Sequence, residues 1–345
     1  MTAPRYDVLG IGNAIVDVLA RAEDDFLVAQ SMRKGTMALI DEPRAEAIYA
    51  AMGPAMEISG GSGANTIVGV ASFGARAAFI GKVKNDTLGH AFTHDIRAAG
   101  VAFDTKPAAD GPSTARCYVL VTPDGERTMN TYLGAAQNLT VADIDETMVR
   151  DSAITYLEGY LWDPPAAKDA FKAAAAIAHG AGREVALTLS DAFCVDRYRD
   201  EFLDLIRTGT VDIVFANEAE LRSLYQTADL GSAIAALRDD AKFAAVTRSE
   251  HGCLVVTRQG TDVFPAFPVE RVVDTTGAGD LFAAGFLTGL ARGRDHATCA
   301  KLGALAAGEV IQHLGARPET SLKALAADNG LTLEHVAPAQ DRTSL

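Results

Sequence analysis

Apolar and polar positions follow two different patterns along this chain. After residue 150, short apolar runs typical of buried strands alternate with longer stretches in which apolar residues recur every three or four positions, as on one face of a helix. The predicted strands are Ile154–Leu157, Glu184–Leu189, Val211–Phe215, Ala244–Thr247 and Gly252–Thr257. The predicted helices are Ala166–His179, Arg197–Ile206, Glu218–Tyr225, Ala278–Ala291 and His296–Leu314. Strands that alternate with helices indicate βαβ units and a mostly parallel sheet.

The first 135 residues break this alternation. They begin with a predicted strand, Tyr6–Ile11, followed by helices at Ala64–Phe73 and Thr87–Ala99 with the strand Ala78–Val83 between them. No linker between these elements and the later ones is long enough to separate two domains. We therefore expect residues 1–345 to form a single α/β domain.

Additional strands in this early region predict a second, smaller sheet. The apolar runs Cys117–Val121 and Arg127–Leu133 flank the turn sequence Pro-Asp-Gly-Glu, which is typical of a hairpin. These strands have no helices to pair with. We expect the inserted segments of roughly 13–60 and 101–136 to form a sheet that projects from the main body, as lids commonly do.

Composition and charge exclude several classes of protein. Hydrophobic residues make up 48% of the 345 positions, which permits a large core and argues against a disordered chain. The net charge of −14 argues against binding to nucleic acid or to an anionic membrane. The four cysteines form no CxxC pair, and the N-terminus has no signal-peptide pattern. We expect a cytoplasmic protein, either a monomer or a homodimer.

The strongest chemical motif is Asp274-Thr275-Thr276-Gly277-Ala278-Gly279-Asp280, which directly precedes an apolar helix. The backbone amides of Gly277, Ala278 and Gly279 are expected at the N-terminus of that helix, where uncapped amides and the helix dipole favour a phosphate. Asp280 then lies in the first turn, where its carboxylate can accept a hydroxyl proton during phosphoryl transfer. The alternative is an ordinary glycine-rich helix start with a charge-complementing Asp.

Two further loops open helices in the same manner. Gly60-Gly61-Ser62-Gly63-Ala64-Asn65 lets backbone amides approach a ligand, and Asn65 offers both a donor and an acceptor. Asn217 and Glu220 follow the apolar strand that ends at Phe215, in the region where open α/β sheets bind ligands. These two residues are candidates for holding Mg²⁺ through water, although an ordinary N-cap with acidic first-turn residues explains them as well.

Near the N-terminus, Gly10-Ile11-Gly12-Asn13-Ala14-Ile15 imitates a dinucleotide-binding motif but lacks its third glycine. Asp17 is more informative because it lies inside an apolar stretch, where an unsatisfied carboxylate is costly. A vicinal diol would supply two donors to this carboxylate. The alternative for Asp17 is an exposed position on a strand.

Together these motifs resemble the ribokinase family, also called the PfkB-type carbohydrate kinases, and the order and spacing of the motifs agree over nearly the whole chain. The resemblance implies a three-layer Rossmann-like core with a small β-sheet lid over the acceptor, ATP as phosphate donor, Mg²⁺, and in some members a monovalent cation such as K⁺. It implies that Asp280 is the catalytic base and that Gly277 to Gly279 form the anion hole. Asn217 and Glu220 match the Mg²⁺-associated motif, and Asp274 and Thr276 match the loop that supports the monovalent cation.

Within the family, the chain looks most similar to the adenosine kinase branch. That likeness implies that Asn13, Asp17, Gly61, Ser62 and Asn65 bind ribose, and that Arg127 in a lid strand reaches the transferring phosphate. It implies a base pocket lined by Ile15, Leu133, Tyr160 and Phe193, and an ATP site that includes Asn217, Thr247, Arg248, Gly252, Gly277 and Gly279.

The chain departs from the family pattern at two places. Ser249 stands where the family usually has glycine in the adenine-side loop, and Tyr160-Leu161-Trp162 replaces a pair of phenylalanines. The acceptor is therefore either a nucleoside, with adenosine preferred, or a sugar such as ribose, fructose or a ketodeoxy acid. A ligand-binding regulator without catalysis is disfavoured by the intact Asp280, and an NAD-dependent oxidoreductase by the incomplete glycine motif.

Overall fold

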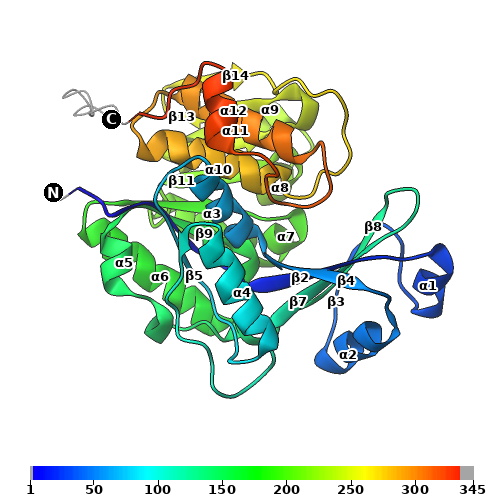
Figure 1. The fold of residues 1–345 in the computed structure, drawn as a ribbon. Coiled ribbons are helices and arrows are strands. Elements are labelled where there is room, and N and C mark those ends of the chain that lie inside the picture. Colours follow the sequence, from blue (N-terminus) through cyan, green and yellow to red (C-terminus); the bar gives the residue numbers. More distant parts are fainter. Residues whose placement is uncertain (1–2, 335–345) are drawn as a thin grey trace.

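A computed structural model describes residues 3–334 of the chain and contains two sheets of unequal size (Figure 1). The large sheet has nine strands in the order β14-β13-β12-β11-β10-β9-β1-β5-β6. Its neighbouring strands run parallel from β6 to β12, and β13 and β14 complete one edge as antiparallel strands. The small sheet has five strands in the order β3-β8-β7-β2-β4.

The strands of the large sheet are β1 (Tyr6–Ile11), β5 (Ala77–Ile80), β6 (Val101–Ala102), β9 (Ser152–Glu158), β10 (Glu184–Thr188), β11 (Ile213–Asn217), β12 (Phe243–Thr247), β13 (Cys253–Thr257) and β14 (Gly260–Phe264). Those of the small sheet are β2 (Ile15–Arg21), β3 (Met37–Leu39), β4 (Ala55–Gly60), β7 (Ala115–Val121) and β8 (Arg127–Tyr132).

The α-helices are α1 (Asp24–Ala29), α2 (Glu42–Ala51), α3 (Ser62–Ser72), α4 (Thr87–Ala98), α5 (Glu146–Arg150), α6 (Pro165–Gly180), α7 (Ala192–Arg207), α8 (Glu218–Leu224), α9 (Leu230–Asp240), α10 (Ala278–Ala291), α11 (His296–Val310) and α12 (Leu322–Asp328). Short 3₁₀ turns are η1 (Gly134–Asn138), η2 (Val141–Asp143), η3 (Gly159–Trp162) and η4 (Ser249–His251).

Helices cover both faces of the large sheet, so its strands are apolar on both sides. Val8 and Tyr156 point to one face, where they pack with residues of α3, α4 and α10 to α12. Leu9 and Leu157, one position further along the same strands, point to the other face and pack with residues of α5 to α9. The predicted three-layer α/β core is thereby confirmed.

The small sheet projects from the side of this core together with α1 and α2 (Figure 1). Its central strands β2 and β7 are parallel, with Ile15 beside Ala115 and Asp17 beside Cys117. Because side chains alternate across a sheet, Val16 and Tyr118 pack in the main core, whereas Ile15, Asp17 and Cys117 line a cleft between the two sheets.

Several elements differ from the prediction. The strands β2, β3 and β4, which supply most of the small sheet, were not predicted individually. The last long helix, α11, ends at Val310 rather than Leu314, because the chain turns at Gly315, whose φ of 108° few other residues adopt. Helix α7 begins five residues early, at Ala192, because the Asp191 carboxylate caps it by accepting a hydrogen bond from the Cys194 amide. Within residues 3–334, no helix has the length and apolarity needed to cross a membrane.

Candidate active site

The two sheets enclose a cleft of about 1850 Å³. One wall comprises the N-termini of α3 and α10 and the carboxyl ends of the core strands. The other wall is the inner face of the small sheet. Most of the predicted site residues line it, namely Asn13, Ile15, Asp17, Gly61, Ser62, Asn65, Arg127, Leu133, Tyr160, Phe193, Asn217, Glu220, Thr247, Thr276, Gly277, Gly279 and Asp280.

The glycine-rich turn before α10 is shaped by Gly277. This residue has a left-handed φ of 79°, and a Cβ there would lie 2.7 Å from the Cα of Ala316, so both backbone conformation and space demand glycine. Gly279 differs, because a Cβ at that position meets no atom within 4 Å. The absence of a side chain at Gly279 leaves space on the cleft side of the helix N-terminus.

Asp280 lies in the first turn of α10 and faces the N-terminus of α3. Its carboxylate accepts a hydrogen bond from the Ser62 hydroxyl at 2.6 Å and a longer one from the Asn65 amide nitrogen at 3.4 Å. Burial raises the pKa of Asp280 to about 6, and the hydrogen bonds from Ser62 and Asn65 act in the opposite direction. The carboxylate is therefore placed and tuned to accept a proton near neutral pH.

A buried carboxylate that the sequence reasoning missed, Glu158, joins the N-terminal loop to α3. It ends β9 and accepts hydrogen bonds from the backbone and side-chain nitrogens of Asn13, at 3.0 and 2.8 Å, and from the amide of Gly63 at 2.9 Å. Gly12 leaves room for it, since a Cβ there would lie 2.2 Å from Glu158 Oε2. Burial raises the pKa of Glu158 to about 7 despite these three donors.

Asp17 has a different environment, because we find no hydrogen bond to its carboxylate from residues 3–334. Burial raises the pKa of Asp17 to about 6, the positive charges of Arg317 and Arg127 lower it, and the negative charge of Asp280 raises it. The side-chain oxygen of the neighbouring Asn13 is buried and likewise lacks a partner within the described part of the chain. Two acceptors thus face the cleft without donors.

Arg127 reaches across the cleft to the loop before α10. Its Nη2 lies 2.6 Å from Asp274 Oδ2, and both side chains are buried. Asp274 also accepts hydrogen bonds from the amide and hydroxyl of Thr276, at 3.0 and 2.7 Å, and from the amide of Gly315 at 3.0 Å. With these four groups around it, the Asp274 carboxylate can contact a monovalent cation only if Arg127 moves away. The same movement would free Arg127 to reach a phosphate.

Asn217 and Glu220 form a capping box at the start of α8. The Asn217 side chain accepts from the Glu220 amide at 2.9 Å, while the two Glu220 oxygens accept from the backbone and side-chain nitrogens of Asn217. Burial raises the pKa of Glu220 to about 7. Each Glu220 oxygen keeps one lone pair for a water molecule, which fits the predicted indirect role toward Mg²⁺ better than direct coordination. No group of three or more His, Cys, Asp or Glu residues suited to a metal occurs among the described residues.

The predicted adenine-side loop divides into two parts. Thr247 ends β12 beside Asn217 and lines the cleft. Arg248 and Gly252 do not line it: Arg248 donates to Glu218 at 2.8 Å, and Gly252 lets β13 pass close to Phe264, since a Cβ would lie 2.0 Å from its carbonyl oxygen. Ser249, which replaces the family glycine, adopts a left-handed φ of 51°. Ser249 thus adopts the left-handed backbone conformation that glycine favours, although it is not a glycine.

One further residue of the cleft, Arg317, was not anticipated. It lies in the loop between α11 and α12, and its Nε donates to Asn65 Oδ1 at 3.3 Å. An isolated Arg in the sequence Gly-Ala-Arg-Pro matches no motif that marks a ligand site. Only the path of the chain after α11 brings this residue to the acceptor end of the cleft.

Fold and site define an α/β kinase that uses ATP to phosphorylate an alcohol. Residues 55–323 match the pfkB family of carbohydrate kinases, and the chain belongs to this family. Its sequence is 57% identical to that of adenosine kinase from Sinorhizobium meliloti, whose crystal structure superposes with a TM-score of 0.88. The alignment covers 94% of this chain and 99% of that one.

Two other relatives extend this comparison. A probable sugar kinase from Rhizobium etli CFN 42 is 54% identical, with a TM-score of 0.90 and coverage of 95% of this chain and 100% of that one. Adenosine kinase from Saccharomyces cerevisiae is 27% identical over 337 residues, which span 91% of this chain and 96% of that protein. The predicted ribokinase-like fold is therefore confirmed.

Proposed function

We propose that this kinase transfers the γ-phosphate of ATP to the 5′-hydroxyl of a nucleoside, with adenosine as the acceptor. The observation that carries the proposal is the inner face of the small sheet, where Asp17 lies among the apolar side chains of Ile15, Leu19, Cys117 and Val119. A ribose diol can donate two hydrogen bonds to one carboxylate, and an apolar surface next to it can cover a purine.

The unpaired acceptors support a hydroxyl-rich ligand at this position. The buried Asn13 side-chain oxygen lacks a donor within the described residues, which is costly, and the Asp17 carboxylate beside it is open to further donors. Adenosine kinase from Sinorhizobium meliloti, at 57% identity over nearly the whole chain, supports a nucleoside rather than a free sugar. The related probable sugar kinase from Rhizobium etli keeps a sugar acceptor as the second candidate.

In the proposed reaction, Asp280 accepts the proton of the acceptor hydroxyl as the oxygen attacks the γ-phosphate. Ser62 and Asn65 hold the Asp280 carboxylate through their hydrogen bonds. The amides of Gly277 and Gly279 stabilise the negative charge that develops on the phosphoryl oxygens, and the amide of Ala278 can join them only by giving up its hydrogen bond to the Thr275 carbonyl. Arg127, once released from Asp274, adds a positive charge on the opposite side.

The proposal includes Mg²⁺ at the Asn217–Glu220 end of the cleft. When bound there through water, Mg²⁺ would neutralise phosphate charge. The four cysteines are free thiols and are buried, which fits a cytoplasmic enzyme.

We further propose that the small sheet acts as a lid. The segments 13–60 and 101–136 contain all five of its strands, and the Arg127–Asp274 ion pair joins it to the core loop across the cleft. Closure over the acceptor would exclude water from the phosphate. The lid therefore predicts slow ATP hydrolysis in the absence of an acceptor, and rapid hydrolysis by the enzyme alone would contradict it.

A coupled assay that follows ADP release tests the acceptor. With Mg-ATP, we expect kcat/KM for adenosine to exceed that for ribose or fructose by about 100-fold or more, because burial of the base adds several kcal/mol at about 25 cal/mol per Å² of apolar area. Inosine and cytidine serve as matched nucleosides with other bases. A simple sugar with a higher kcat/KM than adenosine would replace the nucleoside proposal with the sugar-kinase candidate.

A further inference from the structure

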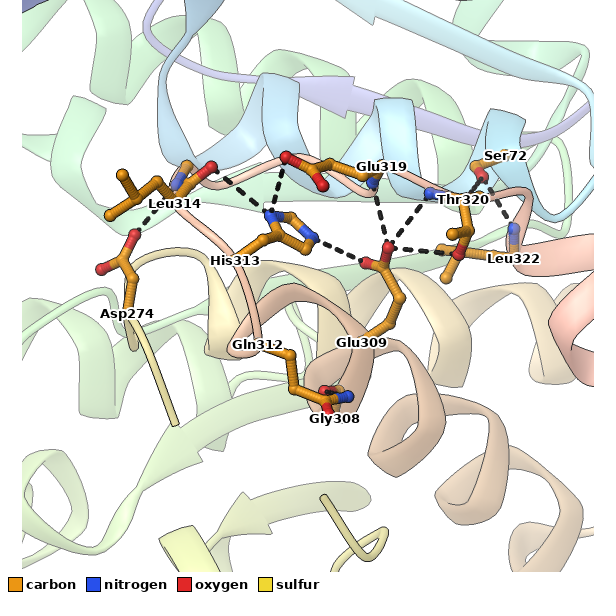
Figure 2. A network of polar contacts seen from close by, with 11 residues as sticks. Ser72, Asp274, Gly308, Glu309, Gln312, His313, Leu314, Glu319, Thr320 and Leu322 are labelled. Atoms are coloured by element: carbon orange, nitrogen blue, oxygen red, sulfur yellow. Dashed lines mark hydrogen bonds and ion pairs between the residues drawn. The ribbon is translucent and has the colours of Figure 1, made fainter. Parts of the chain in front are cut away.

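The loop that carries Arg317 is held firmly at both ends (Figure 2). Glu309, in the last turn of α11, accepts hydrogen bonds from the amides of Glu319 and Thr320 at 3.0 and 3.1 Å, and its other oxygen lies 3.3 Å from His313. Midway along the loop, the Gly315 amide donates to Asp274 at 3.0 Å. Residues 311–321 therefore form a fixed strap beside the cleft.

From this strap, the Arg317 guanidinium contacts two helices at once. Its Nε donates to Asn65 on α3 at 3.3 Å, and its Nη1 donates to Asp95 on α4 at 3.2 Å. Only 16% of the Arg317 side chain is exposed, and its Nη2 is buried without a hydrogen-bond partner in the described part of the chain. A buried guanidinium nitrogen without a partner calls for an explanation.

Each partner of Arg317 leads to a different part of the acceptor site. The side-chain oxygen of Asn65 accepts the hydrogen bond from Arg317, so the side-chain nitrogen of Asn65 points toward Asp280. Asp95 also accepts hydrogen bonds from the backbone amide and the hydroxyl of Ser59. Ser59 lies in β4 directly before Gly60 and Gly61, where the small sheet joins α3.

The charge of Arg317 also acts on Asp17. The groups that face the Asp17 carboxylate are Arg127 from β8, Cys117 from β7, Asp280 from α10 and Arg317 from the strap. Of these, the two arginines favour the ionised carboxylate, which is the form that accepts hydrogen bonds from a diol.

We infer that Arg317 is a positioning residue for the acceptor: it orients the Asn65 amide and, through Asp95 and Ser59, ties the end of the first lid segment to the core. This role rests on the proposed function only for the identity of the acceptor. Arg317 acts on the groups that bind the acceptor rather than on the ATP end of the cleft, where Asn217 and Thr247 lie.

The test compares Arg317→Met, Arg317→Lys and Asp95→Asn, using whichever nucleoside or sugar proves to be the best acceptor of the wild-type enzyme. We expect Arg317→Met to raise the KM of the acceptor at least tenfold while the KM of ATP stays within twofold. The acid limb of kcat/KM for the acceptor should move to higher pH by about one unit, the usual effect of removing a nearby opposite charge.

The other two variants separate geometry from charge. Lysine keeps the charge but not the planar fork, so Arg317→Lys should raise the KM of the acceptor and leave the acid limb near its wild-type position. Asp95→Asn should act in the same way. Arg97→Met, on the exposed side of α4, is the matched control and should change neither the KM of the acceptor nor the KM of ATP.

Two results would overturn the inference. In one, folded Arg317→Met has an acceptor KM within twofold of wild type and an unmoved acid limb. In the other, kcat and thermal stability fall together while neither KM changes, which is what a purely structural arginine predicts. If Arg317→Met does not fold, an unchanged acceptor KM in Arg317→Lys decides against the role. A wild-type preference for a sugar would refute only the nucleoside proposal, because the comparison is made with the best acceptor.

Discussion

One wall of the cleft is formed mainly by helix N-termini and the other by the face of a sheet. The helix wall draws its main groups from two short glycine-containing segments, Gly61 to Asn65 at the start of α3 and Asp274 to Asp280 before and in the first turn of α10, and presents backbone amides and carboxylates. The sheet wall draws single residues from strands that are far apart in sequence, such as Ile15 and Asp17 on β2 and Cys117 on β7. It presents an apolar surface around the Asp17 carboxylate, with Arg127 reaching across the cleft from β8.

This difference matches the two parts of the substrate pair. The phosphate is the same whatever the acceptor, and a fixed loop of amides suits it. The acceptor varies within the family, and a sheet face can change one side chain at a time without disturbing its neighbours. We therefore expect changes on the helix wall to reduce turnover of every acceptor, and changes among the apolar residues of the sheet wall to alter the choice among acceptors.

The largest effect is expected on the helix wall, at Asp280. Asp280→Asn keeps the shape of the side chain but removes the base, so kcat should fall by about 10²–10⁴ with adenosine and with any sugar acceptor. Binding of ATP, measured by calorimetry, should remain within a few-fold of wild type. Near-native turnover by a folded Asn variant would remove Asp280 from the mechanism.

Two glycines of the turn before α10, Gly277 and Gly279, should respond differently to substitution in kcat and in thermal stability. Gly279→Val places its side chain in open space, so it should fold normally while its kcat falls about 10²–10³, as expected for the loss of one anion-hole donor at about 2.7–4 kcal/mol. Gly277→Ala is the comparison variant, because its left-handed φ and the close approach of Ala316 should lower thermal stability in addition to any loss of turnover. Normal turnover by Gly279→Val would show that these amides do not face the phosphate.

The dependence of activity on pH should also distinguish the two walls, although its effect is smaller than those of the substitutions above. Burial raises the pKa of both Asp280 and Asp17 to about 6, so each carboxylate is ionised above this value and becomes protonated as the pH falls through it. We expect kcat to fall about tenfold from pH 7 to pH 5, because Asp280 must accept a proton. In the same range, kcat/KM for the acceptor should fall more steeply, since it requires Asp17 as well. Equal slopes would show that ionisation of Asp17 is not needed for binding.

The sequence predicted the wall whose residues are consecutive in the chain better than the wall whose residues come from separate strands. The DTTGAGD motif predicts a helix N-terminus by itself, and the structure has α10 begin at Ala278. Most of the large sheet was also predictable, because its central strands are buried on both faces and produce strong apolar runs. The edge strands β6 and β14 were not predicted, since β6 has only two residues and β14 is partly exposed. The strands β3 and β4 were not predicted, because β3 has only three residues and β4 mixes apolar residues with Glu57 and Ser59.

The groups that support the acceptor site carry no local pattern at all. Glu158 ends an apolar strand, and Asp95 and Arg317 lie alone on a helix and in a loop. Their roles arise from contacts between residues that are 36 to 252 positions apart, such as the one between Arg317 and Asn65. The only sequence signal for Glu158 was a charged residue inside the run Tyr156-Leu157-Glu158-Gly159-Tyr160, where an uncompensated carboxylate is costly.

The smallest expected effect concerns Phe193, which lies in the first turn of α7 at the edge of the cleft and tests whether a base is bound there. Its side chain is 77% exposed in the ligand-free structure, so Phe193→Ala should leave thermal stability unchanged. If a purine covers about 50 Å² of its ring, about 1.2 kcal/mol is lost at about 25 cal/mol per Å², which corresponds to about eightfold in kcat/KM for adenosine. Ribose does not reach the ring and should react as with the wild-type enzyme.

Asp17→Ala is the matched comparison for Phe193→Ala, because a ribose diol is present in adenosine and in ribose alike, and both acceptors should lose activity. The measurement is kcat/KM for the two acceptors with the two variants, at one ATP concentration. A loss with adenosine alone in Phe193→Ala, beside a loss with both acceptors in Asp17→Ala, supports a base-binding surface next to a ribose-binding carboxylate. Equal losses with both acceptors in Phe193→Ala would instead assign Phe193 to the general closure of the cleft and remove it from base recognition.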